Sequence, residues 1–287
     1  MAWLLLLILL LGMLPSAVFA TSYVAQVDNT QYTTLADAVA NANKAEESVT
    51  LTLLDDIELG ETPTITGDVT IEGEYTITRS NSYTGTLFTV ESGAVLTLND
   101  LTIDGNNKWT FAKESYKDAL DNVTQIINQS AFVTSEENAP IANADMITVN
   151  GTVIMNGSTI KNHMCTSGNG VFSVNKNAVL TMNGATVTHN THPNSSVVAS
   201  VASGAVWTIN GETVISDNHS GSNGGVVRVD NGKVVMNGGS VKKNTGVNNN
   251  GTFIMLYGTG ATFELNDGKI CSHSGVYGKN NGRCAAI

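Results

Sequence analysis

Met182-Asn183-Gly184-Ala185-Thr186-Val187 is the stretch that decides the fold, because related versions of it recur six times along the chain. The asparagine of each copy stands at position 99, 156, 183, 210, 237 or 266, so the steps between copies are 57, 27, 27, 27 and 29 residues. A repeat of this length is typical of a solenoid, in which one coil cannot bury its apolar face alone and stacks on the next.

Apolar side chains occupy three fixed positions in each copy, one and three residues before the asparagine and four residues after it. The three sets are Leu98, Met155, Met182, Ile209, Met236 and Leu265; Leu96, Val153, Leu180, Trp207, Val234 and Phe263; and Ile103, Ile160, Val187, Val214, Val241 and Ile270. Threonine or serine stands between many of them, so apolar and polar positions alternate as in short strands with one face inward. One coil offers strands near 226–229, 233–236 and 240–243. The sequence therefore predicts an all-β protein, a right-handed parallel β-helix solenoid.

The asparagine column itself has a structural explanation. Asparagine tolerates tight bends and the left-handed region, and stacked identical amides can bond to one another along a column. We therefore expect these asparagines to be structural. A leucine-rich repeat is the rival solenoid, but it requires leucine at fixed offsets and a helical segment, whereas the inward positions here mix in β-branched residues.

The chain begins with segments that differ from the repeats. Residues 1–20 contain no charged side chain and have an apolar centre, which predicts a signal peptide cleaved after Ala20. We assign residues 21–60 to an N-terminal cap and first coil, and residues 61–287 to the β-helix. Leu35, Ala38, Val39 and Ala42 have helical spacing, with Thr33 or Thr34 as the N-cap. We expect this short helix to cover the open end of the solenoid.

The long step between Asn99 and Asn156 contains a lateral insert, which we place at residues 106–145. The excess is about one coil, so a coil is either replaced or expanded there. Long excursions from a regular solenoid often carry the binding face. The aromatic residues Trp109, Phe111 and Tyr116 lie in it and are the candidate ligand contacts. The alternative is a flap that merely packs on the wall.

Several stretches carry a family resemblance. The opening Tyr23-Val24-Ala25-Gln26-Val27 and the segment 49–57 resemble the start of many secreted gut-bacterial surface proteins with pectate-lyase-like β-helices. Gly224-Gly225-Val226-Val227 and the segment 235–244 are similar to repeats of bacterial adhesin-like β-helix proteins and, more loosely, of polymorphic outer membrane proteins. The resemblance implies the fold more strongly than any activity, because this fold hosts both enzymes and binders.

Residues suited to catalysis or metal binding are sparse. Lyases of the resembled family use a basic residue beside carboxylates that hold Ca²⁺, but Arg79, Arg228 and Arg283 are far apart in the repeat scheme. The acidic run at 55–58 is more typical of a solvated edge than of a Ca²⁺ site. Four histidines follow the asparagines at scattered offsets, which favours exposed side chains over a metal site; they are His163, His189, His219 and His273.

Charge and cysteine content limit the kinds of partner and the cellular compartment that fit the chain. The net charge of −11 argues against nucleic acid and anionic membranes as partners. The first apolar run is too short for membrane insertion. Cys271 and Cys284 can pair in an oxidising compartment, which would leave Cys165 over, or all three cysteines are reduced thiols; sequence does not decide between these.

These observations favour a secreted or cell-surface, non-catalytic protein. The expected role is adhesin-like or glycan-binding, with a polysaccharide or a host-cell glycan as partner and with no metal or other cofactor. Two alternatives stay open. One is a polysaccharide lyase or glycoside hydrolase of the pectate-lyase-like fold with an unrecognised site. The other is a structural spacer within a larger surface protein.

Overall fold

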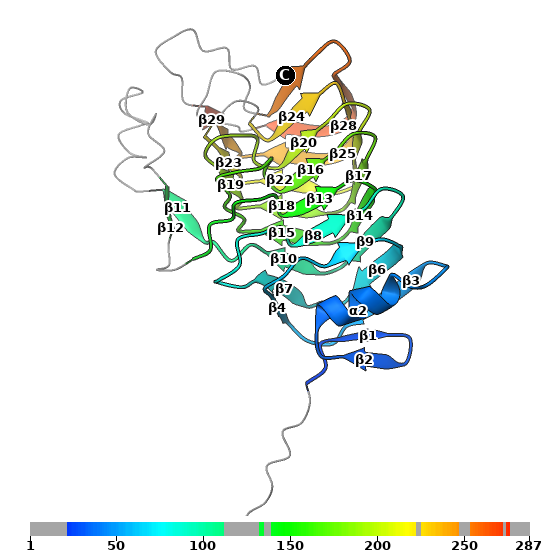
Figure 1. Cartoon of the computed structure of the whole chain (residues 1–287). Coiled ribbons are helices and arrows are strands. Elements are labelled where there is room, and N and C mark those ends of the chain that lie inside the picture. The colour runs from blue at the N-terminus through cyan, green and yellow to red at the C-terminus, as the bar shows by residue number, and fades with distance from the viewer. Residues whose placement is uncertain are drawn as a thin grey trace, which may run out of the picture.

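The computed structural model describes residues 22–111, 132–134, 139–221, 225–246, 253–271 and 274–275; the predicted signal peptide at 1–20 lies outside them. The chain is mostly β and forms a parallel β-solenoid of about six turns. Corresponding strands of successive coils stack in one direction (Figure 1). Within the described residues, no helix is both long and apolar enough to span a membrane.

Three walls of parallel strands enclose the core. The first wall stacks β3 (Val49–Leu53), β6 (Asp68–Glu72), β9 (Val95–Asn99), β14 (Thr152–Asn156), β17 (Val179–Asn183), β21 (Val206–Asn210) and the first halves of β25 (Lys233–Lys242) and β28 (Thr262–Cys271). The second wall stacks β4 (Ile57–Leu59), β7 (Thr76–Arg79), β10 (Thr102–Asp104), β15 (Thr159–Lys161), β18 (Thr186–Thr188), β22 (Val214–Ser216) and the second halves of β25 and β28.

The third wall stacks β5 (Thr64–Ile65), β8 (Phe88–Val90), β13 (Ile147–Val149), β16 (Phe172–Val174), β20 (Ala199–Val201), β24 (Val227–Asp230) and β27 (Ile254–Tyr257). Between the second and third walls, the later coils add a short ladder of β19 (Thr191–His192), β23 (His219–Ser220), β26 (Thr245–Gly246) and β29 (Ser274–Gly275).

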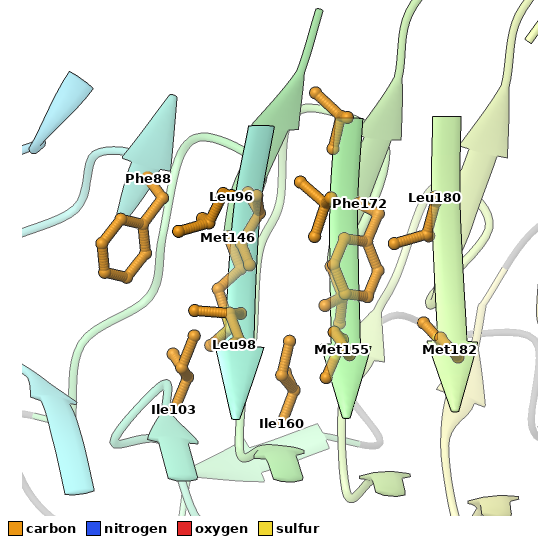
Figure 2. Packing of buried hydrophobic residues seen from close by; sticks show 14 of the residues in the cluster. Phe88, Leu96, Leu98, Ile103, Met146, Met155, Ile160, Phe172, Leu180 and Met182 are labelled. Atoms are coloured by element: carbon orange, nitrogen blue, oxygen red, sulfur yellow. The ribbon is translucent and has the colours of Figure 1, made fainter. Parts of the chain in front are cut away.

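The repeated apolar positions form the core, as the sequence predicts. Met155, Met182 and Met236 are fully buried, and the side chains of successive coils lie above one another between the walls (Figure 2). The strand register aligns Leu96 with Val153 on the next coil, and then Leu180. Each fully buried side chain of this size stabilises the fold by about 1.5–3 kcal/mol, so the core is the main source of stability.

The asparagines form the expected ladder. Each side-chain amide donates to Oδ1 of the asparagine one coil earlier, at 2.8–2.9 Å, in an unbroken series of Asn99, Asn156, Asn183, Asn210, Asn237 and Asn266. The asparagines are therefore structural. A positive φ follows each asparagine instead. It falls on the next residue at Asp100, Gly157, Gly184 and Gly211, and two residues later at Gly239 and Gly268; glycine adopts this region most readily. The asparagine therefore stays in the strand.

One inward position differs from the prediction. Ile215, not Val214, pairs with Val187 and is fully buried, whereas Val214 faces outward and is partly exposed. The physical reason is one additional residue in the turn between Asn210 and β22, which holds Gly211 and Glu212. A shift of one residue exchanges the two faces of a strand, so constant spacing from the asparagine fails in this coil.

The N-terminal elements pack on the first coil. β1 (Ala25–Val27) pairs antiparallel with β2 (Thr30–Tyr32) on one side and with β3 on the other. The helix α2 (Leu35–Ala42) begins after Thr34, whose hydroxyl accepts from the backbone N–H of Asp37 at 3.1 Å. Thr34, one of the two N-cap residues that the sequence offers, is therefore the N-cap. The four apolar residues with helical spacing are all buried, so the helix contributes its apolar face to the core; its role as a cap stays a prediction.

Candidate functional site

The lateral insert leaves the wall between β10 and β13 without disturbing the coils on either side. Asn99 and Asn156 are direct neighbours in the ladder, and β9 pairs with β14 over five residues. The 57-residue step is therefore one expanded coil, not a replaced one. The insert opens with β11 (Trp109–Phe111), which pairs antiparallel with β12 (Phe132–Thr134).

The structure places two of the three predicted ligand contacts in this hairpin. Trp109 lies opposite Thr134, and Phe111 lies opposite Phe132. Tyr116 lies outside the described residues. The hairpin therefore brings Trp109 and Phe111 into one strand at the base of the insert.

The base of the insert is tied to the solenoid by a buried asparagine. Asn107 is fully buried; its backbone N–H donates to the carbonyl of Asn162 and its side-chain amide donates to the carbonyl of Pro140, both at 3.0 Å. Its neighbour Asn106 donates from its side chain to the carbonyl of Arg79 at 2.9 Å. The two ends of the insert are thus joined to each other and to adjacent coils, which fixes the point where the insert emerges.

A buried arginine lies beneath this base. Arg79 takes an inward position at the end of β7 and is fully buried. One guanidinium nitrogen donates to the carbonyl of Gly85, another lies 3.5 Å from Nδ1 of His163, and the group lies 5.9 Å from the centre of the Tyr83 ring. No carboxylate pairs with it within the described part of the chain, and its Nε has no partner. Burial lowers the pKa of Arg79 to about 10, which leaves it charged at neutral pH.

The neighbouring histidine and cysteine are neutral. Burial, followed by the positive charge of Arg79 and then His192, holds the pKa of His163 well below its usual range. Burial, and next the carboxylate of Asp145, raises the pKa of the Cys165 thiol to about 12. A nucleophilic cysteine needs a lowered pKa and some exposure. This pair is therefore unsuited to nucleophilic catalysis.

His192 and Asp145 complete the buried polar cluster, which we define as Arg79, Asp145, His163, Cys165 and His192. Burial lowers the pKa of His192 to about 4. The contact of its ring with the carbonyl of Gly168, at 3.3 Å, raises this pKa, but by less than burial lowers it. Burial also raises the pKa of Asp145, and hydrogen bonds from Asn169 and Ser173 oppose that shift. The residues come from several successive coils and meet where the second wall turns toward the third.

The prediction that the four histidines are exposed is correct for His189 and wrong for His163 and His219. His163 and His219 are 1% and 2% exposed, and His273 lies outside the described residues. His219 is buried because β23 stacks between β19 and β26, and His163 is buried because it begins a second column, of asparagines. The backbone N–H of His163 donates to Oδ1 of Asn190 at 2.9 Å, and Asn190 and Asn218 make the same contact with the next coil.

Sequence reasoning missed this second column, although its spacing was visible. Asn190, Asn218 and Asn244 follow the first column by seven, eight and seven residues, and His163 follows it by seven. A buried position in a regular coil was therefore indicated for His163. The sequence also indicated that Arg79 is buried, because Arg79 continues the alternation of inward and outward residues in β7 at an inward position.

The outward faces carry scattered charges. Ion pairs join Lys161 to Asp104 and Arg228 to Asp230 at 3.5 Å, and Lys233 to Glu264 at 2.7 Å. Each of these pairs joins one cation to one carboxylate. No group of three or more potential metal ligands occurs among the described residues. The thiol of Cys271 is free and exposed, and Cys284, with which it could pair in one of the two alternatives, lies outside the described residues.

Fold and site together define a parallel β-solenoid with a lateral insert above a polar cluster centred on the buried Arg79. No protein family model, curated protein or solved structure matches the chain.

Proposed function

We propose that this chain is a secreted or cell-surface, non-catalytic solenoid that presents its lateral insert to a glycan. The observation that carries the proposal is the anchoring of the insert. The coils beside it stay in register from Asn99 to Asn156, and Asn107 ties its two ends together. Binding loops held on a rigid scaffold lose little freedom when they bind.

Further features support the same proposal. Trp109 and Phe111 lie in the hairpin at the base of the insert, and aromatic side chains commonly supply large, specific contact area. The leader-like segment at 1–20 and the net charge of −11 are compatible with an extracellular protein. A right-handed, pectate-lyase-like β-helix remains our interpretation of the repeats.

The neutral Cys165 and His163 give an enzyme no activated nucleophile. The ion pairs on the outward walls join single charges and offer no base flanked by two carboxylates. Lyase or hydrolase activity therefore remains the less favoured alternative.

The test is glycan binding by the full chain and by a variant in which residues 112–131 are replaced with a short Gly-Ser linker. We expect the full chain to bind acidic or neutral polysaccharides on an array and the variant to lose binding while keeping its far-ultraviolet circular dichroism. As a matched control, the exposed turn 46–48 is replaced with glycines, and binding is retained. Binding that survives removal of 112–131 contradicts the role of the insert, and release of unsaturated or reducing ends contradicts a non-catalytic protein.

A further inference from the structure

β28 lies at the end of the solenoid away from α2 (Figure 1). At this end apolar residues are exposed at positions that are buried in earlier coils. Leu265 on β28 is 48% exposed, whereas Met236, its partner on the preceding coil, is fully buried. Phe263 and Ile270 are also only partly buried. Within the described residues β28 pairs along one side only, with β25. A long strand edge beside exposed apolar residues is a surface that proteins normally cover.

The order of residues along β28 suggests what covers it. The strand bends from the first wall to the second near Asn266 and Asp267, and its inward and outward positions are arranged symmetrically about that bend. Phe263 and Ile270 face inward at equal distances from it, and Glu264 and Lys269 face outward. These four residues therefore keep the same order when the strand is followed from either end, whereas Leu265 corresponds to Gly268.

We propose that two copies of this chain associate through β28, paired antiparallel about a two-fold axis that passes between Asn266 and Asp267. This register puts Phe263 of one copy opposite Ile270 of the other, so apolar residues meet across the ends of both cores. It also puts Glu264 opposite Lys269 twice, once on each side of the axis. Opposite charges facing each other across antiparallel strands are favourable.

Glu264 bonds to Lys233 on the preceding coil at 2.7 Å. In the proposed dimer its carboxylate would therefore lie between Lys233 of its own chain and Lys269 of the other copy, and a carboxylate has two oxygens that can accept from two cations. The opposite end of the solenoid favours a two-fold arrangement over head-to-tail stacking. There β1 pairs antiparallel with β3 and β2 pairs with β1, so a hairpin covers the edge of the first wall. A two-fold contact closes after two copies, whereas head-to-tail contacts extend into filaments.

The first test is sedimentation equilibrium of the full chain over a range of concentrations. We expect a reversible dimer. Lys269→Glu and Glu264→Lys should each weaken self-association by roughly tenfold, because each places like charges opposite one another twice. An equimolar mixture of the two variants should recover the affinity, since both opposite-charge pairs form again in the mixed dimer. The control Lys176→Glu, which changes an exposed lysine between β16 and β17, should leave the affinity unchanged.

A substitution at Asp267 should strengthen self-association instead of weakening it. The two-fold axis brings the Asp267 carboxylates of the two copies close together, so Asp267→Asn should strengthen the dimer. A chain that is monomeric at every concentration overturns the proposal. A dimer whose affinity responds equally to Lys176→Glu and Lys269→Glu overturns it as well.

The second test fixes the register. Thr262 and Cys271 lie at the two ends of β28 and face outward, and the proposed register places them opposite each other in the dimer. Directly opposite Cβ atoms lie about 4.5–5.5 Å apart, close to the separation in a disulfide. In a Cys284→Ser background, Thr262→Cys should give a covalent dimer when diamide accepts the two electrons and two protons of the paired thiols. The controls Thr208→Cys and Thr262→Cys/Cys271→Ser should not cross-link, and cross-linking of Thr208→Cys at the same rate contradicts the register.

Discussion

The side-chain amide of Asn183 donates a hydrogen bond at 2.8 Å to Oδ1 of Asn156, its direct neighbour on the preceding coil. The same contact recurs from Asn99 to Asn266. An amide inside the column uses both its oxygen and its nitrogen along the solenoid axis. The ladder therefore couples each coil to both neighbours, independently of the backbone ladder.

Replacing an interior member of the ladder should cost more than replacing its last member. Asn183→Ala removes two side-chain hydrogen bonds and leaves partners on both adjacent coils unpaired, so we expect a loss of about 1–3 kcal/mol in the free energy of unfolding. Asn266→Ala removes one exposed bond, to Asn237, and should cost less than half as much. Urea unfolding followed by circular dichroism measures both. Equal losses would show that the amides do not act as a ladder.

The core should show a similar difference between its interior and its end. Met155 is fully buried between two coils, so Met155→Ala should lower the free energy of unfolding by about 2–5 kcal/mol through lost burial and a cavity. Leu265 faces the same core but is 48% exposed, so Leu265→Ala should cost less than about 2 kcal/mol in the isolated chain. Urea unfolding at low protein concentration separates this effect from dimer formation. A larger loss for Leu265→Ala than for Met155→Ala contradicts the exposed end.

The buried histidines predict a loss of stability in acid. Burial lowers the pKa of His192 to about 4 and of His219 to about 3, while in the unfolded chain both regain a value near 6.5. The unfolded state therefore binds more protons below pH 6.5, and stability falls as the pH is lowered from there toward 4. Each such histidine should contribute a loss of about 1.4 kcal/mol per pH unit, measured as the free energy of unfolding against pH.

His163 offers a specific variant for this test. The corresponding position of the following coils holds Asn190 and Asn218, so His163→Asn should fit the column and reduce the acid slope. His189 is exposed, and His189→Gln serves as the control that should leave the slope unchanged. An acid slope that is identical in His163→Asn and the parent chain would show that His163 is not held neutral in the fold.

The extra residue beside β22 allows a deletion test. Removing Glu212, which is exposed, would place Ile215 four residues after Asn210, the spacing found in the neighbouring coils. We expect this deletion to be tolerated within about 1 kcal/mol, because the register that buries Ile215 is kept. Deleting Ala185 instead would turn Val187 outward and should unfold the chain or cost several kcal/mol. Thermal unfolding compares the two, and comparable destabilisation contradicts the assigned register.

Residue pattern alone determined the solenoid, its inward columns and its stacked asparagines. This was possible because each coil has the same local pattern. Apolar residues alternate with polar ones, and an asparagine and a turn recur at a fixed distance. A short-range period of this kind can be recognised from the sequence alone. The helix at 35–42 was predictable for the same reason, and the structure chose Thr34 over Thr33 as its N-cap.

Only the tertiary structure decided how the chain folds where it departs from the repeat pattern. It showed that the step from Asn99 to Asn156 is one expanded coil, that Ile215 replaces Val214 in the core, and that β1 pairs with β3. It also brought Arg79 within 3.5 Å of His163, a residue 84 positions away in the sequence. Such contacts depend on which coils become neighbours after an insertion, and a spacing rule along the chain does not contain that information. The physical reason is that burial and charge at these positions are set by stacking between coils, not by the residues adjacent in sequence.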